Sequence, residues 1–112
     1  MNESILISIK KLLGIAKEYD VFDPDIIMHI NTVFMTLNQL GVGPEGGFRI
    51  EDDIATWNQY ISNEDNLDAV KSYIHLKVKL LFDPPLNSSV IEAMKQSISE
   101  LEWRLNVQAE SK

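Results

Sequence analysis

The chain of 112 residues contains no cysteine. This absence excludes a disulfide framework, a thiolate metal site and a cysteine nucleophile, and it fits a reducing compartment. Long apolar runs are also missing, since none approaches the ~20 residues that a bilayer-spanning helix needs. Lys10 and Lys11 interrupt the apolar pattern near the N-terminus, which does not have the layout of a signal peptide. We therefore expect a single intracellular domain that does not contact a membrane and is long enough to bury its own core.

Basic residues are scarce in the middle of the chain. The net charge is −7, and residues 42–69 carry Arg49 alone against seven acidic residues, namely Glu45, Glu51, Asp52, Asp53, Glu64, Asp65 and Asp68. Binding to nucleic-acid phosphates needs clustered Lys and Arg, so this composition disfavours a nucleic-acid-binding role. The acids are scattered through a loop and helix starts, which is typical of a solvated surface.

Apolar residues recur at helical spacing in four stretches, which predicts helices at about residues 4–19, 23–41, 65–82 and 89–108. The intervening segment 42–64 begins with "VGPEGGFRIEDD", which is too rich in glycine to continue a helix, and its Trp57 lies in a stretch that can add one helical turn. The predicted fold class is all-α: one four-helix domain with a glycine-rich loop inserted between the second and third helices.

Local signals set the expected ends of these helices. Asp23 is predicted to cap the second helix, and Gly41 to end it. Pro84 and Pro85 stop the third helix, and a capping box that starts at Ser89 opens the fourth. The buried stripe of the second helix is expected to contain Ile26, Ile30, Val33, Phe34, Leu37 and Leu40.

Residues that carry chemistry are not grouped into any familiar site. His29 and His75 lie on different predicted helices without ligand spacing, and the glycine-rich stretch lacks the Lys-Ser/Thr of a phosphate-binding loop. Adjacent acids such as Asp52 and Asp53 more often cap helices than catalyse. We therefore expect no enzyme activity, no cofactor and no metal.

Some apolar residues lie away from the predicted core faces. Trp103 lies about 160° from the apolar seam of its helix, and Val107 shares its side. Met28 and Met35 likewise lie behind the stripe of the second helix. Trp103 either packs on another part of the chain or meets a partner, since protein interfaces are enriched in Trp. Helices with apolar groups on both sides suit a subunit that lies between neighbours.

Three stretches resemble a family of small tailed-phage proteins. They are "VKSYIHLKVKLLFDPPLNSSVIEAMKQSISELEWRL" at 70–105, "LNQLGVGPEGGFRI" at 37–50 and "TWNQY" at 56–60, and the likeness is closest at FDPP and ELEWRL. On these residues the chain is identified as a member of the head–tail connector family (head-completion or adaptor proteins) of long-tailed phages and prophages. The predicted N-terminal helix is the part that the resemblance covers least.

The resemblance implies a small α-helical subunit that docks beneath the portal protein after DNA packaging, and that is located in the host cytoplasm during assembly and in the virion neck afterwards. Copies of the subunit would form a ring, extend the DNA channel and offer a platform to the next connector or the tail-terminator protein. DNA would pass without specific binding. The family implies no catalytic residues and no cofactor.

Two segments are candidates for setting the contacts of such a ring. The glycine-rich loop, with Gly43, Pro44, Gly46 and Gly47, could order against a partner with Phe48 as its apolar anchor, or it could be a surface turn with Phe48 on its own core. The corner Asp83-Pro84-Pro85 could fix the angle between the last two helices, or it could simply stop a helix.

A different class of function also fits the composition. An acidic helical regulator, such as a phage-encoded inhibitor that mimics nucleic acid, would use the acidic residues 42–69 to bind a basic protein. Competition for a basic host protein would distinguish it from a connector.

Overall fold

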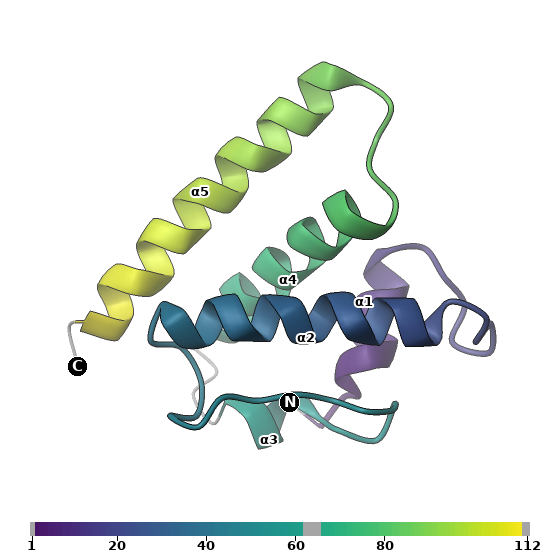
Figure 1. Ribbon diagram of the computed structural model, residues 1–112, viewed down its shortest axis with the longest axis horizontal. Helices are drawn as coiled ribbons and strands as arrows, with labels where there is room; N and C mark the ends of the chain where they lie inside the picture. Colours follow the sequence, from purple (N-terminus) through teal and green to yellow (C-terminus); the bar gives the residue numbers. More distant parts are fainter. Residues whose placement is uncertain (1, 62–65, 111–112) are drawn as a thin grey trace.

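The computed structural model describes residues 2–61 and 66–110. Helices account for most of them (Figure 1): α1 (Ile5–Leu12), α2 (Asp23–Gln39), α3 (Trp57–Tyr60), α4 (Leu67–Phe82) and α5 (Ser88–Glu110). The described residues contain no β-strand, only an isolated antiparallel bridge between Ser4 and Thr56. The all-α class is therefore confirmed, with α3 as a fifth, one-turn helix. The predicted boundary between the irregular segment and the third helix, at 64–65, lies outside the described residues.

Helix α1 is shorter than predicted, because it ends at Leu12 and not at residue 19. Gly14 follows with φ of +81°, a left-handed conformation that stops a helix and that glycine adopts without strain. At the other end, the Ser4 side chain accepts a hydrogen bond from the Ile7 amide at 3.2 Å and caps the helix. The prediction of a helix over 4–19 was thus wrong in its second half.

A buried lysine holds the chain between α1 and α2. The side chain of Lys10 is 1% exposed, and its Nζ donates to the carbonyl oxygens of Lys17 at 3.1 Å and Tyr19 at 2.8 Å. The same Nζ lies 2.8 Å from Asp23 Oδ1 at the start of α2. The Lys10 ammonium therefore holds segment 13–22 against α1 and the start of α2. This segment is irregular, although the apolar spacing predicts a helix through residue 19.

Helix α2 begins and ends close to its predicted limits. Asp23 is the first helical residue and Phe22 is the cap, so the expected capping role of Asp23 was wrong. Pro24 stands in the first turn, where a missing N–H costs no hydrogen bond. The helix ends at Gln39, and Gly41 turns the chain away with φ of +87°.

Helices α4 and α5 are antiparallel neighbours joined by residues 83–87 (Figure 1). The Asn87 side chain accepts from the amides of Ser89 at 2.8 Å and Val90 at 3.3 Å, so Asn87 caps α5 and the capping box predicted at Ser89 was wrong. Tyr73 of α4 donates to Glu102 Oε2 of α5 at 2.6 Å. Burial, together with this carboxylate, raises the pKa of Tyr73, so the hydroxyl stays a donor that links the two helices.

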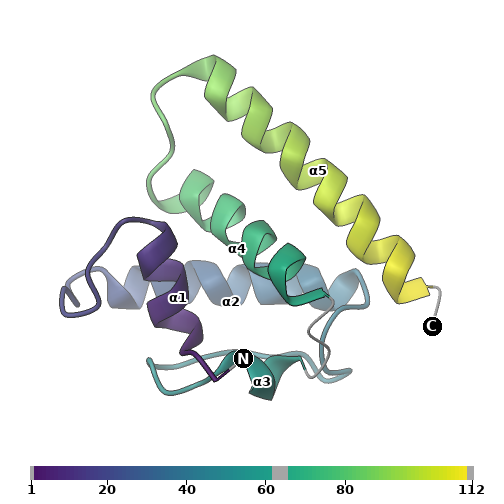
Figure 2. The same cartoon turned by 180° about the vertical axis from the view of Figure 1, so that it is seen from behind.

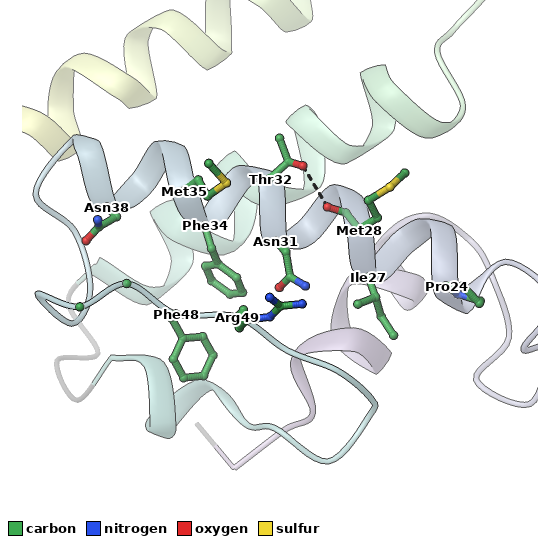
Figure 3. A pocket seen from close by; sticks show the side chains of 12 residues that line it. Pro24, Ile27, Met28, Asn31, Thr32, Phe34, Met35, Asn38, Phe48 and Arg49 are labelled. Atoms are coloured by element: carbon green, nitrogen blue, oxygen red, sulfur yellow. Dashed lines mark hydrogen bonds between the residues drawn. The ribbon is translucent and has the colours of Figure 1, made fainter.

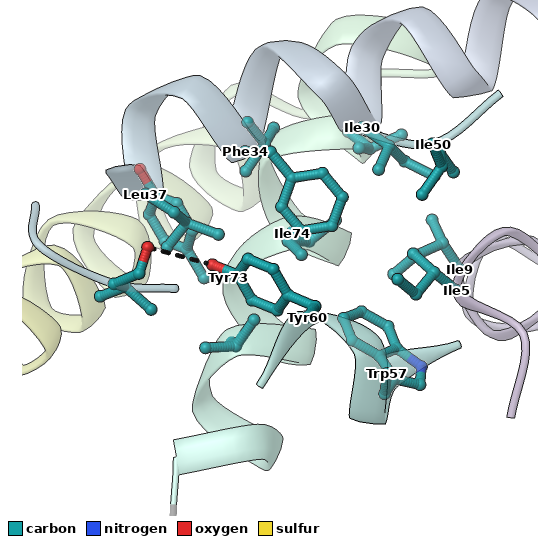
Figure 4. Close-up of a cluster of buried hydrophobic side chains, with 14 of the residues drawn as sticks. Ile5, Ile9, Ile30, Phe34, Leu37, Ile50, Trp57, Tyr60, Tyr73 and Ile74 are labelled. Atoms are coloured by element: carbon teal, nitrogen blue, oxygen red, sulfur yellow. Dashed lines mark hydrogen bonds between the residues drawn. The ribbon is translucent and has the colours of Figure 1, made fainter. Parts of the chain in front are cut away.

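The core lies where α2 crosses α4, with α1 against both of them (Figure 2). Figure 4 shows many of its side chains. Those that are labelled come from α1, α2, α3 and α4 and from Ile50 in the loop after α2: Ile5, Ile9, Ile30, Phe34, Leu37, Ile50, Trp57, Tyr60, Tyr73 and Ile74. Helix α5 adds only Ile98 and Leu105 as buried residues, although it is the longest helix of the described chain. Most of α5 is therefore left on the surface.

His75 of α4 predicts a pH dependence of stability. Burial lowers the pKa of His75 below its ordinary value, and Lys79 lowers it further. The unfolded chain therefore binds a proton near pH 6.5 that the folded chain takes up only at lower pH. Stability is expected to fall as the pH drops below about 6.5, and His75→Gln should flatten this dependence. Urea unfolding of both proteins between pH 5.5 and 7.5 measures the two slopes, and parallel slopes would contradict the prediction.

Candidate protein interface

The glycine-rich loop is fastened to the fold at both ends. Val42 and Ile50 are buried. Asn31 of α2 pairs with the backbone of Ile50 twice, because its Oδ1 accepts from the Ile50 amide at 2.8 Å and its Nδ2 donates to the Ile50 carbonyl at 2.9 Å. Segment 43–47 between these anchors lies mostly in solvent. The loop is therefore held at both ends, and its middle part, residues 43–47, is accessible to a partner.

Phe48 contacts the chain's own core. Its ring centroid lies 5.3 Å from those of both Phe34 and Tyr60, and the side chain is half-buried. Burial raises the pKa of Tyr60, whose hydroxyl is directed at the Val42 carbonyl 3.5 Å away. This aromatic cluster agrees with the interpretation of a surface turn that rests on its own core. The exposed part of Phe48 remains open for contact.

Gly43 is required by close packing as well as by backbone conformation. Its φ is +90°, and a Cβ added there would lie 2.6 Å from Cε1 of the buried Tyr60. Gly43→Ala is therefore expected to cost about 2 kcal/mol or more in the free energy of unfolding. Gly46→Ala is the matched control, because its added Cβ meets nothing within 4 Å and its φ is not positive. Urea midpoints that shift equally for both variants would refute this role of Gly43.

A groove runs between α2 and this loop (Figure 3). Its volume is about 640 Å³, and its lining includes Ile27, Met28, Thr32, Met35, Phe48 and Arg49. Met28 and Met35 are 57% and 67% exposed, far more than core methionines would be. Gly46 and Gly47 complete its wall on the loop side. We call this feature the α2 groove.

An acidic hollow adjoins the α2 groove and shares Pro24, Ile27 and Arg49 with it. Six carboxylates from two separate segments line it, with Lys17 and Arg49 as the basic residues of its lining: Glu18, Asp20, Asp23, Glu51, Asp52 and Asp53. Asp23 among them is paired with Lys10. Only Glu51, Asp52 and Asp53 belong to the acidic stretch 42–69, whose acids the sequence shows as scattered, and the fold adds Glu18, Asp20 and Asp23 to them. In the described part of the chain, however, no three metal-ligating side chains are placed to hold one ion.

Trp103 and Val107 are exposed on α5, at 67% and 43%. Most of the Trp103 side chain is therefore left uncovered by the residues that the structure describes. The α2 groove and the Trp103 side of α5 are two separate surfaces that expose large apolar side chains.

The corner at Asp83 is held by local contacts. The Asp83 amide donates to the Lys79 carbonyl at 2.9 Å, and Lys79 Nζ lies 2.9 Å from Asp83 Oδ2. Leu86 follows the two prolines and is fully exposed. The corner thus ends α4 and projects an apolar side chain into solvent.

Comparison with known proteins gives one match. A sequence model of the phage connector protein family matches residues 5–112. No curated protein and no solved structure matches the chain. Within the described residues, no helix has the length and apolar character needed to cross a membrane. The phage connector family is structural and not enzymatic. Because the match covers nearly the whole chain, the protein belongs to the phage connector protein family.

Proposed function

We propose that the chain forms a ring of identical subunits in the virion neck, directly below the portal protein. The ring extends the DNA channel and gives the next connector, or the tail-terminator protein, a surface on which to dock. Membership of the phage connector family, over residues 5–112, is the observation that carries this proposal.

The shape and surface of the subunit support this role. The fold measures 39 × 35 × 20 Å, so it is a flat body that can stand beside copies of itself. A ring needs two different patches that meet head to tail, and the α2 groove and the Trp103 side of α5 supply two. A net charge of −7 lets DNA pass without being held.

The content of purified virions tests the proposal. Mass spectrometry of particles from the encoding phage should find several copies of the chain for each portal complex. Its absence from infectious particles would refute the connector role.

The corner Asp83-Pro84-Pro85 is proposed to keep the angle between α4 and α5 the same in every copy. Pro84→Ala combined with Pro85→Ala should change the free energy of unfolding by less than about 1 kcal/mol, because Pro84 is exposed and Pro85 half-buried. The yield of joined heads and tails should fall, because α5 would no longer be presented at one angle. Unchanged stability together with an unchanged yield would show that the prolines only stop a helix.

The acidic hollow favours a second candidate function, that of a regulator that binds a basic protein. Its six carboxylates lie around one depression, as such a binding site requires. Competition between this chain and nucleic acid for a basic host protein would support the regulator, and absence of competition would exclude it.

A further inference from the structure

The side of α5 opposite the core is both apolar and acidic. At 100° per residue, Val107, Glu92, Glu100 and Glu110 all lie within about 60° of Trp103. No basic residue between Ser88 and Glu110 lies in that sector, since Lys95 and Arg104 are about 80° and 100° away. All three glutamates are exposed. We call this surface the outer face of α5. It presents two apolar side chains beside Glu92 and Glu110, while Glu100 is ion-paired with Arg104 at 2.6 Å.

The α2 groove has the complementary character. Arg49 is the only charged residue among those described as lining it, and the exposed Met28 and Met35 supply apolar, polarizable contact. Figure 3 shows Arg49 reaching from the loop towards Asn31, while Ile27 and Phe34 point from α2 towards the loop. The chain has a net charge of −7, so most of its surface repels an acidic helix. The α2 groove does not, because its one charged lining residue, Arg49, is positive.

We propose that the outer face of α5 of one copy occupies the α2 groove of the next copy. Trp103 enters the groove against Met28 and Met35, where sulfur–aromatic contact adds to apolar burial. Arg49 at the edge of the groove meets the glutamates that flank the tryptophan. This pairing deepens the proposed ring and rests on it, because it names the two surfaces that join one subunit to its neighbour.

The arrangement of charge also directs the contact. The acidic hollow lies beside Arg49 and would repel the glutamates of α5, so the incoming helix is confined to the α2 side of the arginine. The two surfaces differ in composition, and neither is complementary to itself. The contact is therefore heterologous, and repetition of a heterologous contact closes into a ring when the rotation allows it.

Disulfide cross-linking in assembled particles tests the pairing. Because the chain has no native cysteine, each introduced thiol is the only one in its chain. Cells that carry the gene-deleted phage would express two variants together, Met35→Cys and Val107→Cys, each with a single thiol. Purified particles would then be oxidised and run on a non-reducing gel. A covalent dimer from the mixture must join two copies, because neither chain can cross-link within itself.

The mixture of Met35→Cys and Val107→Cys is expected to give dimers. Each variant alone should give few, and so should Met35→Cys mixed with Leu86→Cys, since Leu86 is exposed but lies outside the proposed contact. Particles that contain the protein but yield no dimer from the test pair, or as many from the control pair, would overturn the pairing. Particles that lack even the wild-type chain would refute the connector role itself, which is a different failure.

A photo-cross-linking residue at position 35 identifies what lies in the groove. Mass spectrometry of the cross-linked product should recover a peptide from α5 of another copy. A product with a different virion protein would place another partner in the groove and overturn the proposal.

Discussion

Replacing Trp57 with alanine is expected to lower the free energy of unfolding by about 3–5 kcal/mol. The Trp57 side chain is 0% exposed, and its Nε1 donates to Ser8 Oγ at 3.0 Å. The Ser8 hydroxyl in turn donates to the Ser4 carbonyl at 2.6 Å, so the indole fastens α3 to the start of α1. The substitution leaves a cavity and a buried hydroxyl without one partner. A domain of this size has a stability of roughly 5–15 kcal/mol, so the loss removes a large share of the total at the lower end of that range.

The second tryptophan of the chain is the matched control. Trp103→Ala removes the same side chain from an exposed position and should change the free energy of unfolding by no more than about 0.5 kcal/mol. Urea unfolding followed by circular dichroism compares the two variants. Similar midpoint shifts for Trp57→Ala and Trp103→Ala would contradict the assignment of one residue to the core and the other to the surface.

Trp103→Ala is expected to have its large effect on assembly. If Trp103 anchors each subunit contact, its loss should cost about 2 kcal/mol or more per contact, which is roughly 30-fold in affinity. The effect repeats around the ring, so infectious titre should fall at least as far. Leu86→Ala removes another exposed apolar side chain outside the proposed contact and should leave the titre near that of the wild type. The measurement is plaque titre after complementation of the gene-deleted phage by each variant.

Equal titres for Trp103→Ala and Leu86→Ala would remove Trp103 from the interface. The comparison is informative only if both variants fold, which their unfolding midpoints establish independently. We expect Trp57→Ala to lower the free energy of unfolding, and Trp103→Ala to lower the titre without a comparable loss of that free energy.

Periodic burial could be predicted from the sequence. The stripe Ile26, Ile30, Val33, Phe34 and Leu37 is buried as its spacing indicates, whereas Leu40, predicted to belong to it, is only half-buried. The helices predicted to begin at 4, 23 and 89 start within one residue of α1, α2 and α5. The angle of Trp103 and Val107 to the apolar seam of α5 placed them off the core face, but only the structure shows that they are exposed. These features depend on the geometry of one helix at a time, which a sequence carries directly.

Features that join distant segments could not be predicted in this way. Asn31 holds Ile50, and Trp57 holds Ser8, through contacts that exist only after the chain has folded. The burial of Lys10 was also missed, although Gly14 gave a local signal that α1 ends early. Asn87 takes the cap predicted for Ser89 because both residue types cap well, and the path of the preceding chain decides between them.

The acidic surface shows the same limit. Glu18 and Asp20 are far in sequence from Asp52 and Asp53, and only the packing of segment 13–22 against the loop that follows α2 brings them to one hollow. The proximity of these carboxylates could therefore not be predicted from any local sequence pattern. The α2 groove likewise combines α2 with a loop whose path depends on the Asn31–Ile50 contact.

Electron microscopy of lysates from the encoding phage with this gene deleted tests the connector role most directly. A connector between the portal and the tail predicts heads that are filled with DNA, or that leak it, beside separate and complete tails. Expression of the wild-type chain from a plasmid should restore joined particles. Normal infectious particles in the absence of the gene would contradict the account and leave the acidic regulator as the better explanation.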